Sequence, residues 1–191
     1  MKSDRVVIGV SIANELRKIH SLLVGVVIFF SQVPQYSEVV RKAGLTARVS
    51  IQSFDWRTLM AMKRIAPEIA RACLTIEALN FDTIKRGEAG SSPWTAGLDI
   101  DDFDGSVPRL VQAAGCQVWS PLHRNARPDD VAAAKALGLK VIPWTVNERA
   151  DMERLMALGV DGIITDYPDR LRAVMAEKGM PLPPAIKMRS R

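Results

Sequence analysis

The feature that most constrains the fold is a strand-then-helix pattern that occurs twice in succession near the C-terminus. The first copy runs from the apolar segment 140–146 into an amphipathic stretch at 148–156. We expect Asn147, which lies between the two, to cap that helix. The second copy runs from 159–166 into a helical pattern that begins at Pro168, a residue that favours the first helical turn. Consecutive units of this kind predict a parallel sheet covered by helices.

Three more strands are expected upstream, each separated from the next by a helical pattern. Their apolar segments lie at 48–54, 69–75 and 117–120. The helical patterns are expected at about 35–43, ended by Gly44, at 55–65, capped by Asp55, and at 107–114 and 129–137. Together with the strands around 141 and 163, these segments give about five βα units.

The first 33 residues fit this pattern less well. The segment 6–12 is a candidate for one further strand. The apolar run 22–30 is expected to be a buried strand or an aberrant segment, because it falls well short of the roughly 20 residues that a membrane-spanning helix needs. We therefore expect no membrane span.

Two architectures accommodate repeated βα units: an open doubly wound sheet and a (βα)₈ barrel. The open sheet normally carries a glycine-rich phosphate-binding turn after its first strand, and the sequence shows none. The barrel places polar and aromatic residues where its strands end, because that rim carries the site. Such pairs do occur at the expected strand ends: Ser53-Phe54, Trp119-Ser120, Trp144-Thr145 and Thr165-Asp166. The pattern therefore favours the barrel.

Charge and cysteine content restrict the class of partner and the compartment. The 191 residues carry a net charge of +5, but three of the basic residues lie in the terminal stretch 187–191, and no aromatic residues alternate with them. This composition is typical of a solvated tail, so we expect no nucleic-acid binding. Cys73 and Cys116 are far apart in sequence and lie in apolar surroundings, so we expect two free buried thiols and a reducing, cytoplasmic location.

Three motifs, taken in order, resemble a known family. They are VSIQSFDWRTL at 49–59, VIPWTVN at 141–147 and GVDGIITDYPDRL at 159–171. Together they look like the C-terminal part of the glycerophosphodiester phosphodiesterase family, over roughly 37–177. The resemblance implies an incomplete (βα)₈ TIM barrel that holds about the last five units. It divides the chain into an atypical segment 1–33, a barrel part 34–179 and a basic, proline-containing tail 180–191.

The family resemblance also implies an activity: hydrolysis of glycerophosphodiesters to glycerol 3-phosphate and an alcohol, with a divalent metal, Mg²⁺ or Ca²⁺, and catalytic histidines. The motifs that supply these groups in the family are His-Arg-Gly, Pro-Glu-Asn-Thr, Glu-x-Asp, His-Asp and Asn-x-Glu-x-Lys, and none occurs here. We therefore assign no catalytic and no metal-ligating residue. The sequence predicts a truncated chain that is inactive by itself, and whether it is an enzyme stays open.

The alternative is a non-catalytic fragment or pseudoenzyme that acts by associating with a partner chain. An incomplete barrel leaves strand edges and apolar faces uncovered, so self-association through the open edges is expected. The small-molecule partner, a glycerophosphodiester, is what the family resemblance implies.

Several polar residues invite a catalytic interpretation that the pattern does not favour. His123 is followed by Arg124-Asn125, yet it lies after the sixth barrel strand, so we expect a surface-loop histidine. Asn14-Glu15 has the wrong spacing for the metal motif. The acidic run around Asp99 to Asp104 is expected to be a solvated loop, because its register does not match a calcium-binding loop. Asp161 and Asp166 are expected to be turn and cap residues.

Three residues are predicted to bind substrate. Trp144 matches the tryptophan that lines the pocket in the family, so we expect its ring at the rim, facing the barrel axis near Gln52 or Phe54 and Trp119; a core aromatic residue is the alternative. Gln52 and Phe54 point to the same face of their strand, so either can shape the floor of the site. Layered packing inside the barrel is the competing interpretation for both.

Overall fold

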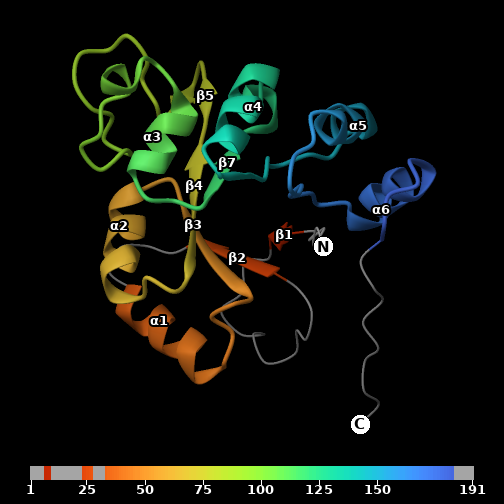
Figure 1. Ribbon diagram of the computed structural model, residues 1–191, viewed down its shortest axis with the longest axis horizontal. Coiled ribbons are helices and arrows are strands. Elements are labelled where there is room, and N and C mark those ends of the chain that lie inside the picture. The colour runs from red at the N-terminus through yellow and green to blue at the C-terminus, as the bar shows by residue number, and fades with distance from the viewer. Residues whose placement is uncertain (1–6, 10–22, 28–32, 183–191) are drawn as a thin grey trace.

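A parallel sheet with helices around it forms the protein (Figure 1). The computed structural model describes residues 7–9, 23–27 and 33–182. Within these ranges the sheet has six strands in the order β1-β2-β3-β4-β7-β8, and every neighbouring pair is parallel. The strands are β1 (Val7–Gly9), β2 (Leu23–Val27), β3 (Val49–Ser53), β4 (Ala70–Thr75), β7 (Val118–Pro121) and β8 (Lys140–Val141).

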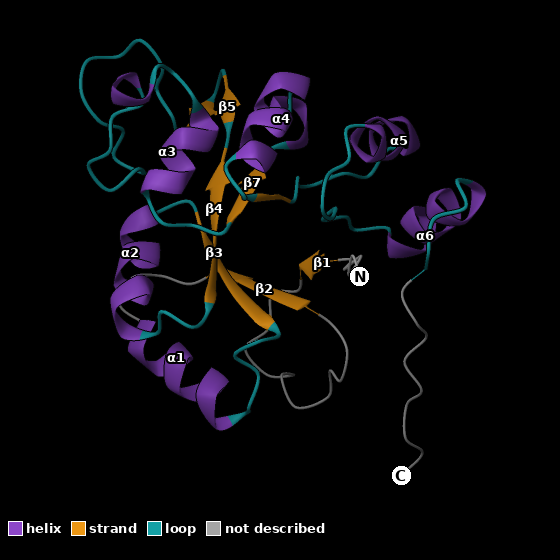
Figure 2. Ribbon diagram, in the orientation of Figure 1, coloured by secondary structure: helices purple, strands orange, loops and turns teal. Residues whose placement is uncertain are grey.

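Helices follow the strands and cover the outside of the sheet (Figure 2). They are α1 (Val33–Lys42), α2 (Trp56–Ile65), α3 (Val107–Ala113), α4 (Pro128–Ala136), α5 (Arg149–Ala157) and α6 (Pro168–Glu177). Two short 3₁₀ turns, η3 (Asp101–Phe103) and η4 (His123–Asn125), lie in the connections. A small antiparallel hairpin, β5 (Glu77–Ala78) and β6 (Phe81–Asp82), stands apart from the main sheet.

Local sequence signals set several of these boundaries as expected. The carboxylate of Asp55 accepts a hydrogen bond from the backbone amide of Arg57 at the start of α2. Gly44 follows α1 with a φ of +66°, a backbone conformation that favours glycine. Pro168 occupies the first turn of α6. The strand within 6–12 and the strand within 22–30 are also present, as β1 and β2.

The last expected strand, around 163, is the exception. Residues 161–166 run beside β8 and the residues that follow it. Backbone hydrogen bonds run from Asp161 N to Val141 O at 2.9 Å, from Ile164 N to Pro143 O at 2.9 Å and from Val146 N to Ile164 O at 2.8 Å, yet residues 161–166 form no regular strand. The expectation of a fifth regular strand is wrong. Pro143 has no N–H to donate, and the carboxylate of Asp161 takes the Val141 amide at 2.9 Å, so the ladder between the two segments is irregular.

The barrel is not closed in the described part of the chain. Six strands and the segment 161–166 form one curved row, and no pairing among the described residues joins β1 to 161–166. An eight-stranded barrel closes its sheet edge to edge. The structure therefore confirms an incomplete barrel rather than an open doubly wound sheet.

The two faces of the sheet carry different side chains. Strand register places Ser53, Cys73, Trp119 and Val141 side by side. The last three belong to the main core, together with helix residues such as Met62 and Leu110, so this is the helix-facing layer. The opposite, inner face holds a small cluster of Ala72, Val118 and Ile142, with Ile164 packed against it. Most of the buried apolar side chains therefore lie on the helix-facing side of the sheet, and few lie on the inner face.

Cys73 and Cys116 are joined by a disulfide, with 5.9 Å between their Cα atoms. The expectation of two free thiols is wrong. Cys73 lies on the helix-facing side of β4, directly beside Trp119, and Cys116 precedes β7 by two residues. The parallel pairing of β4 with β7 thus brings together two residues that are 43 positions apart.

None of the helices in the described ranges combines the length and the apolar character that crossing a bilayer requires.

Candidate functional site

The candidate site lies at the rim where the strands reach their carboxyl ends. In a parallel sheet these ends all lie along one edge, so residues that follow different strands meet there. Phe54 follows β3 and Leu122 follows β7, and Leu122 pairs with Trp144 in an isolated parallel bridge beyond β8. The irregular stretch after Pro143 therefore still holds Trp144 in line with its neighbouring strand.

Backbone and side-chain bonds fix Trp144 on the inner face of the rim. Its backbone amide donates to Pro121 O at 3.0 Å, and its carbonyl accepts from His123 N at 2.8 Å. Its indole Nε1 donates to Ser120 O at 2.8 Å. The ring remains partly exposed and meets Phe54 edge to face, with 5.4 Å between the ring centroids. Trp144 and Phe54, predicted together from the sequence, do lie together.

Gln52 lies on the same face, one layer below Phe54. It pairs in register with Ala72, which belongs to the inner cluster, and Ser53 points to the other face. Gln52 is half-buried, and its side-chain amide makes no hydrogen bond within the described part of the chain. The amide is therefore a polar group on the inner face that remains available to a ligand.

Two further aromatic residues extend this arrangement away from the strands. Phe81, on β6, contacts Phe54 with ring centroids 5.8 Å apart, and Trp94 contacts Phe81 at 5.4 Å. All three ring pairs meet edge to face, at interplanar angles of 85°, 71° and 86°. We call Trp144, Phe54, Phe81 and Trp94 the aromatic row. Phe81 and Trp94 were not predicted, because they belong to a long connection without strand or helix periodicity.

Trp119 does not join the site, and the expectation that Trp144 lies beside it on one face is wrong. Only 1% of Trp119 is exposed, and its indole Nε1 donates to Thr75 Oγ1 at 2.9 Å within the helix-facing layer. The inner residues Val118 and Ser120 flank Trp119 in sequence, and strand alternation turns its ring the other way. Trp119 is a core residue.

Asn147 links two loops instead of capping α5. Its side-chain oxygen accepts from Asp166 N at 3.0 Å and from Thr165 Oγ1 at 3.2 Å, and its amide donates to the Asp166 carboxylate at 2.8 Å. The residue before α5 is Glu148, which makes no side-chain cap bond. The capping prediction for Asn147 is wrong, because the neighbouring segment 161–166 offers closer partners than the helix. This bond network ties the last two rim loops together.

His123 points away from the rim. Its side chain is only 14% exposed, so the expectation of a surface-loop histidine is wrong. Its Nδ1 is buried, lies 3.5 Å from Asp151 Oδ1 on α5 and makes no hydrogen bond. Arg154 donates to Asp151 Oδ1 at 3.2 Å and to the His123 carbonyl at 3.0 Å. His123 therefore belongs to the contact between η4 and α5, not to the site.

The described residues do not provide a metal site. No group of three or more His, Cys, Asp or Glu residues in these ranges is arranged to hold a metal ion. In the acidic loop, Asp99 accepts from the backbone amide of Asp101 at 3.1 Å, and Asp104 pairs with Arg109 at 2.5 Å. A hard divalent cation needs several oxygen ligands around one point. The metal that the family resemblance implies does not fit these residues. The motif-like pair Asn14-Glu15 lies outside the described residues.

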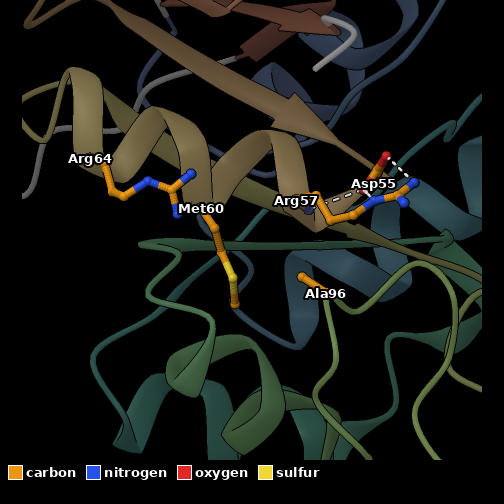
Figure 3. Close-up of a pocket in the computed structure, with 5 residues that line it drawn as sticks. All are labelled: Asp55, Arg57, Met60, Arg64 and Ala96. Atoms are coloured by element: carbon orange, nitrogen blue, oxygen red, sulfur yellow. Dashed lines mark hydrogen bonds and ion pairs between the residues drawn. The ribbon is translucent and has the colours of Figure 1, made fainter. Parts of the chain in front are cut away.

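A separate cavity of about 480 Å³ lies along α2, outside the rim (Figure 3). It is lined by Asp55, Arg57, Met60, Arg64 and Ala96. Arg57 folds back onto the Asp55 carboxylate with bonds of 2.8 and 2.7 Å, and this contact raises the pKa of Arg57. Arg57 therefore already has a carboxylate partner within the lining of this cavity.

A polar network fixes the hairpin that carries Phe81. The Asn125 side chain accepts from Glu77 N and donates to Glu77 O, both at 3.0 Å. Arg86 forms an ion pair with the Glu77 carboxylate and donates to the Gly105 carbonyl. These bonds connect the hairpin to η4 on one side and to the connection before α3 on the other. The hairpin that carries Phe81 is thus fixed by side-chain bonds at its base.

Comparison with known proteins gives one consistent family. Residues 30–170 match the sequence profile described as the glycerophosphoryl diester phosphodiesterase family. A glycerophosphodiester phosphodiesterase of Caldanaerobacter subterraneus subsp. tengcongensis is 27% identical over 155 residues, which is 81% of this chain and 54% of that protein. The chain spans about half the length of the curated relatives that it matches.

Solved structures agree with this result. A Silicibacter pomeroyi protein assigned to the glycerophosphoryl diester phosphodiesterases superposes with a TM-score of 0.67 at 30% identity, covering 83% of this chain and 51% of that one. An Oleispira antarctica phosphodiesterase, solved with the product sn-glycerol-3-phosphate, gives a TM-score of 0.56 at 17% identity, covering 81% and 55%. At that identity the second match concerns the fold alone.

Proposed function

This chain belongs to the glycerophosphoryl diester phosphodiesterase family, and from that membership we propose that its rim binds the glycerol phosphate part of a glycerophosphodiester. The observation that carries the proposal is the contact of Trp144 with Phe54 above the amide of Gln52, which makes no side-chain hydrogen bond among the described residues. Aromatic rings pack well against the carbon face of a glycerol unit, and an amide can bond to its hydroxyl or phosphate oxygens. The Oleispira phosphodiesterase, which binds sn-glycerol-3-phosphate, supports this ligand class.

In this proposal the chain's own residues bind and orient the ligand. Trp144 is locked by its bond to Ser120 O, so its ring meets the ligand without first losing conformational freedom. Gln52 lies in β3 and Phe54 directly follows this strand, on the same face. Gln52 is positioned by strand register, and Trp144 by its bridge to Leu122 and its bond to Ser120 O.

We propose that the chain alone does not turn over glycerophosphodiesters. Hydrolysis needs a group that activates water and an acid that protonates the leaving alkoxide. His123 is turned toward Asp151, and the catalytic motifs of the family are absent from the sequence. Purified chain is expected to release no choline from glycerophosphocholine above background with Mg²⁺ or Ca²⁺ present. Turnover that disappears with EDTA would contradict this.

The divalent metal belongs, in this proposal, to turnover and not to binding by these residues. The described residues do not assemble its ligands, so EDTA is expected to leave the affinity for glycerol 3-phosphate unchanged. Calorimetric titration with and without EDTA measures this. A large loss of affinity with EDTA would place a metal at the rim after all.

A second candidate function is association with another chain, and the open sheet is the observation that favours it. The edges at β1 and at 161–166 are not joined in the described residues, and unpaired edges are templates for pairing. We propose self-association through these edges. Light scattering is expected to show dimers or larger species, and a concentration-independent monomer would contradict the proposal.

The remaining assignments are proposals too. We propose that residues 34–179 form the barrel part, flanked by 1–33 and 180–191, although the pairing of β2 with β3 joins part of the first segment to the sheet. A cytoplasmic location is also proposed, and the Cys73–Cys116 disulfide weighs against it, because cytoplasmic thiols are kept reduced. Mass spectrometry of the chain, denatured and alkylated at isolation without a reductant, counts the alkyl groups added: two groups indicate free thiols, and none indicates the disulfide.

A further inference from the structure

We propose that the outer part of the aromatic row, with the tip of the β5–β6 hairpin, binds a hydrocarbon chain carried by the diester. The preferred ligand of this chain would then be a glycerophosphodiester with an alkyl or acyl chain, and not one with two small polar ends. The inference rests on the proposed function, because it extends the same rim surface outward from Trp144.

Continuity with the rim is the first observation. Trp144 and Phe54 stand on the inner face where the glycerol unit is proposed to bind, and Phe81 and Trp94 continue the same unbroken series of ring contacts. A ligand held at Trp144 by one end meets carbon surface along this direction. No charged side chain belongs to the row.

The second observation is the exposure of the hairpin tip. Leu79, in the turn between β5 and β6, is fully exposed at 107%, and Phe81 is 39% exposed. Single exposed apolar residues are ordinary on protein surfaces. These two are different because Phe81 belongs to the aromatic row that begins at the candidate site, and Leu79 lies two residues before it in the turn of the same hairpin.

The hairpin is also prevented from folding its tip inward. The Glu77–Asn125 bonds and the Arg86 contacts with Glu77 and the Gly105 carbonyl hold its base on two sides. Thr83 Oγ1 accepts from Ile76 N at 3.1 Å and closes the base further. A polar framework that keeps Leu79 and Phe81 in solvent leaves their apolar surface for a ligand to cover.

The chemistry of the row favours a hydrocarbon over a charged group. The basic residues that follow the hairpin are already paired, Lys85 with Glu88 at 2.6 Å and Arg86 with Glu77, so they offer no free cation for an anion. A quaternary ammonium group needs open ring faces that converge on one point. Here each edge-to-face contact covers a ring face, and the rings follow one another in a row, which suits an extended chain.

Titration of the full-length chain with three water-soluble probes tests the inference, with binding measured by calorimetry. The probes are glycerophosphocholine, 1-octanoyl-glycerophosphocholine and the octyl monoester of glycerol 3-phosphate, all below their micelle concentrations. The first probe reports the proposed function, and the other two carry the chain on the glycerol or on the alcohol side. We expect at least one of the two probes with an eight-carbon chain to bind at least tenfold more tightly than glycerophosphocholine. The tighter of the two shows whether the chain is carried on the glycerol side or on the alcohol side of the phosphate.

Variants locate the chain on the hairpin. Leu79→Ser is expected to remove much of the tenfold gain and to leave the affinity for glycerophosphocholine unchanged. Phe81→Ser is expected to remove most of the gain and to lower the affinity for glycerophosphocholine by a smaller factor, because Phe81 packs against Phe54. Leu79 is fully exposed, so its variant folds even where Phe81→Ser does not. Ile65→Ser is the matched control, since Ile65 is 39% exposed like Phe81 but lies at the end of α2, away from the row. It is expected to change nothing.

Two results separate failure of the inference from failure of the proposed function. Equal affinities for glycerophosphocholine and both octyl probes, or a gain that survives Leu79→Ser and Phe81→Ser, would overturn the hydrocarbon surface and leave the rim assignment standing. Binding of the octyl probes that depends on Phe81, without any binding of glycerophosphocholine, would overturn the proposed function and support the surface. Affinity only for octyl probes above their micelle concentration would overturn the inference in favour of an aggregate surface.

Discussion

Trp119 and Trp144 lie on neighbouring segments of one sheet, and they have opposite roles. Trp119 is 1% exposed, with its indole bonded to Thr75 inside the helix-facing layer. Trp144 is partly exposed at the rim, with its indole bonded to Ser120 O and its edge against Phe54. Their residue type and motif context are similar, so what separates core from site is the parity of each position along its strand and its distance from the strand end.

The largest effect is expected from Trp119→Ala. Removing a fully buried tryptophan ring leaves a cavity and an unpaired Thr75 hydroxyl, at a cost of about 3–5 kcal/mol in the free energy of unfolding. Denaturant unfolding measures the loss. Trp144→Ala serves as the matched variant and is expected to lose less than half as much stability. Equal losses would mean that Trp144 is a core residue too.

The second-largest loss of stability is expected from removing the disulfide of the helix-facing layer. Replacing both Cys73 and Cys116 by alanine opens a link across 43 residues and is expected to lower the free energy of unfolding by about 2–4 kcal/mol. Reduction with dithiothreitol in the unmodified chain should reproduce most of that loss. Ligand affinity at the rim is expected to stay unchanged in the folded fraction, since neither cysteine reaches the inner face.

Trp144→Ala is expected to act on binding more than on folding. The lost ring surface and edge contact correspond to about 1–3 kcal/mol in the binding free energy for glycerol 3-phosphate. Calorimetric titration measures it, and Tyr167→Ala, which removes an exposed aromatic ring outside the row, is the control. A collapse of stability with unchanged affinity in the surviving folded protein would show that the pocket assignment is wrong.

Gln52→Leu gives the smallest and most specific effect. Because the Gln52 amide makes no hydrogen bond within the described residues, its replacement costs no internal bond, and the unfolding free energy is expected to change little. Binding of glycerol 3-phosphate is expected to lose about 0.5–1.5 kcal/mol, the net value of one hydrogen bond. Unchanged affinity together with raised stability would mean that Gln52 is only a packing residue.

Much of the fold was predictable because it depends on local patterns. The strands β3, β4 and β7 and the boundaries at Gly44, Asp55 and Pro168 follow from apolar runs, a cap, a terminating glycine and a first-turn proline, all of which act within a few residues. The segment 161–166 was not predicted correctly, since its irregular pairing depends on the missing donor of Pro143 and on the Asp161 carboxylate of the segment itself, which takes the Val141 amide.

The candidate site divides in the same way. Phe54 beside Trp144 was predicted, because both follow motifs at strand ends. Phe81 and Trp94 were missed, since their connection has no periodicity that places a side chain. The Cys73–Cys116 bond was missed because the sequence does not state which strands are neighbours, and the register of β4 with β7 is what brings the pair together. Residues that follow recognisable strand motifs could be placed at the rim, and contacts made by the irregular connections or set by strand pairing could not.

The most direct test of the rim assignment is the response of the indole N–H signals to ligand in solution. The chain has four tryptophans, so ¹⁵N-labelled protein gives four indole N–H signals. Replacing each tryptophan in turn by phenylalanine assigns them. On titration with glycerol 3-phosphate we predict a saturable shift of the Trp144 signal, while the signals of the buried residues Trp56 and Trp119 stay in place. A shift of Trp119 with Trp144 unmoved, or no saturable shift of any signal, would contradict the account.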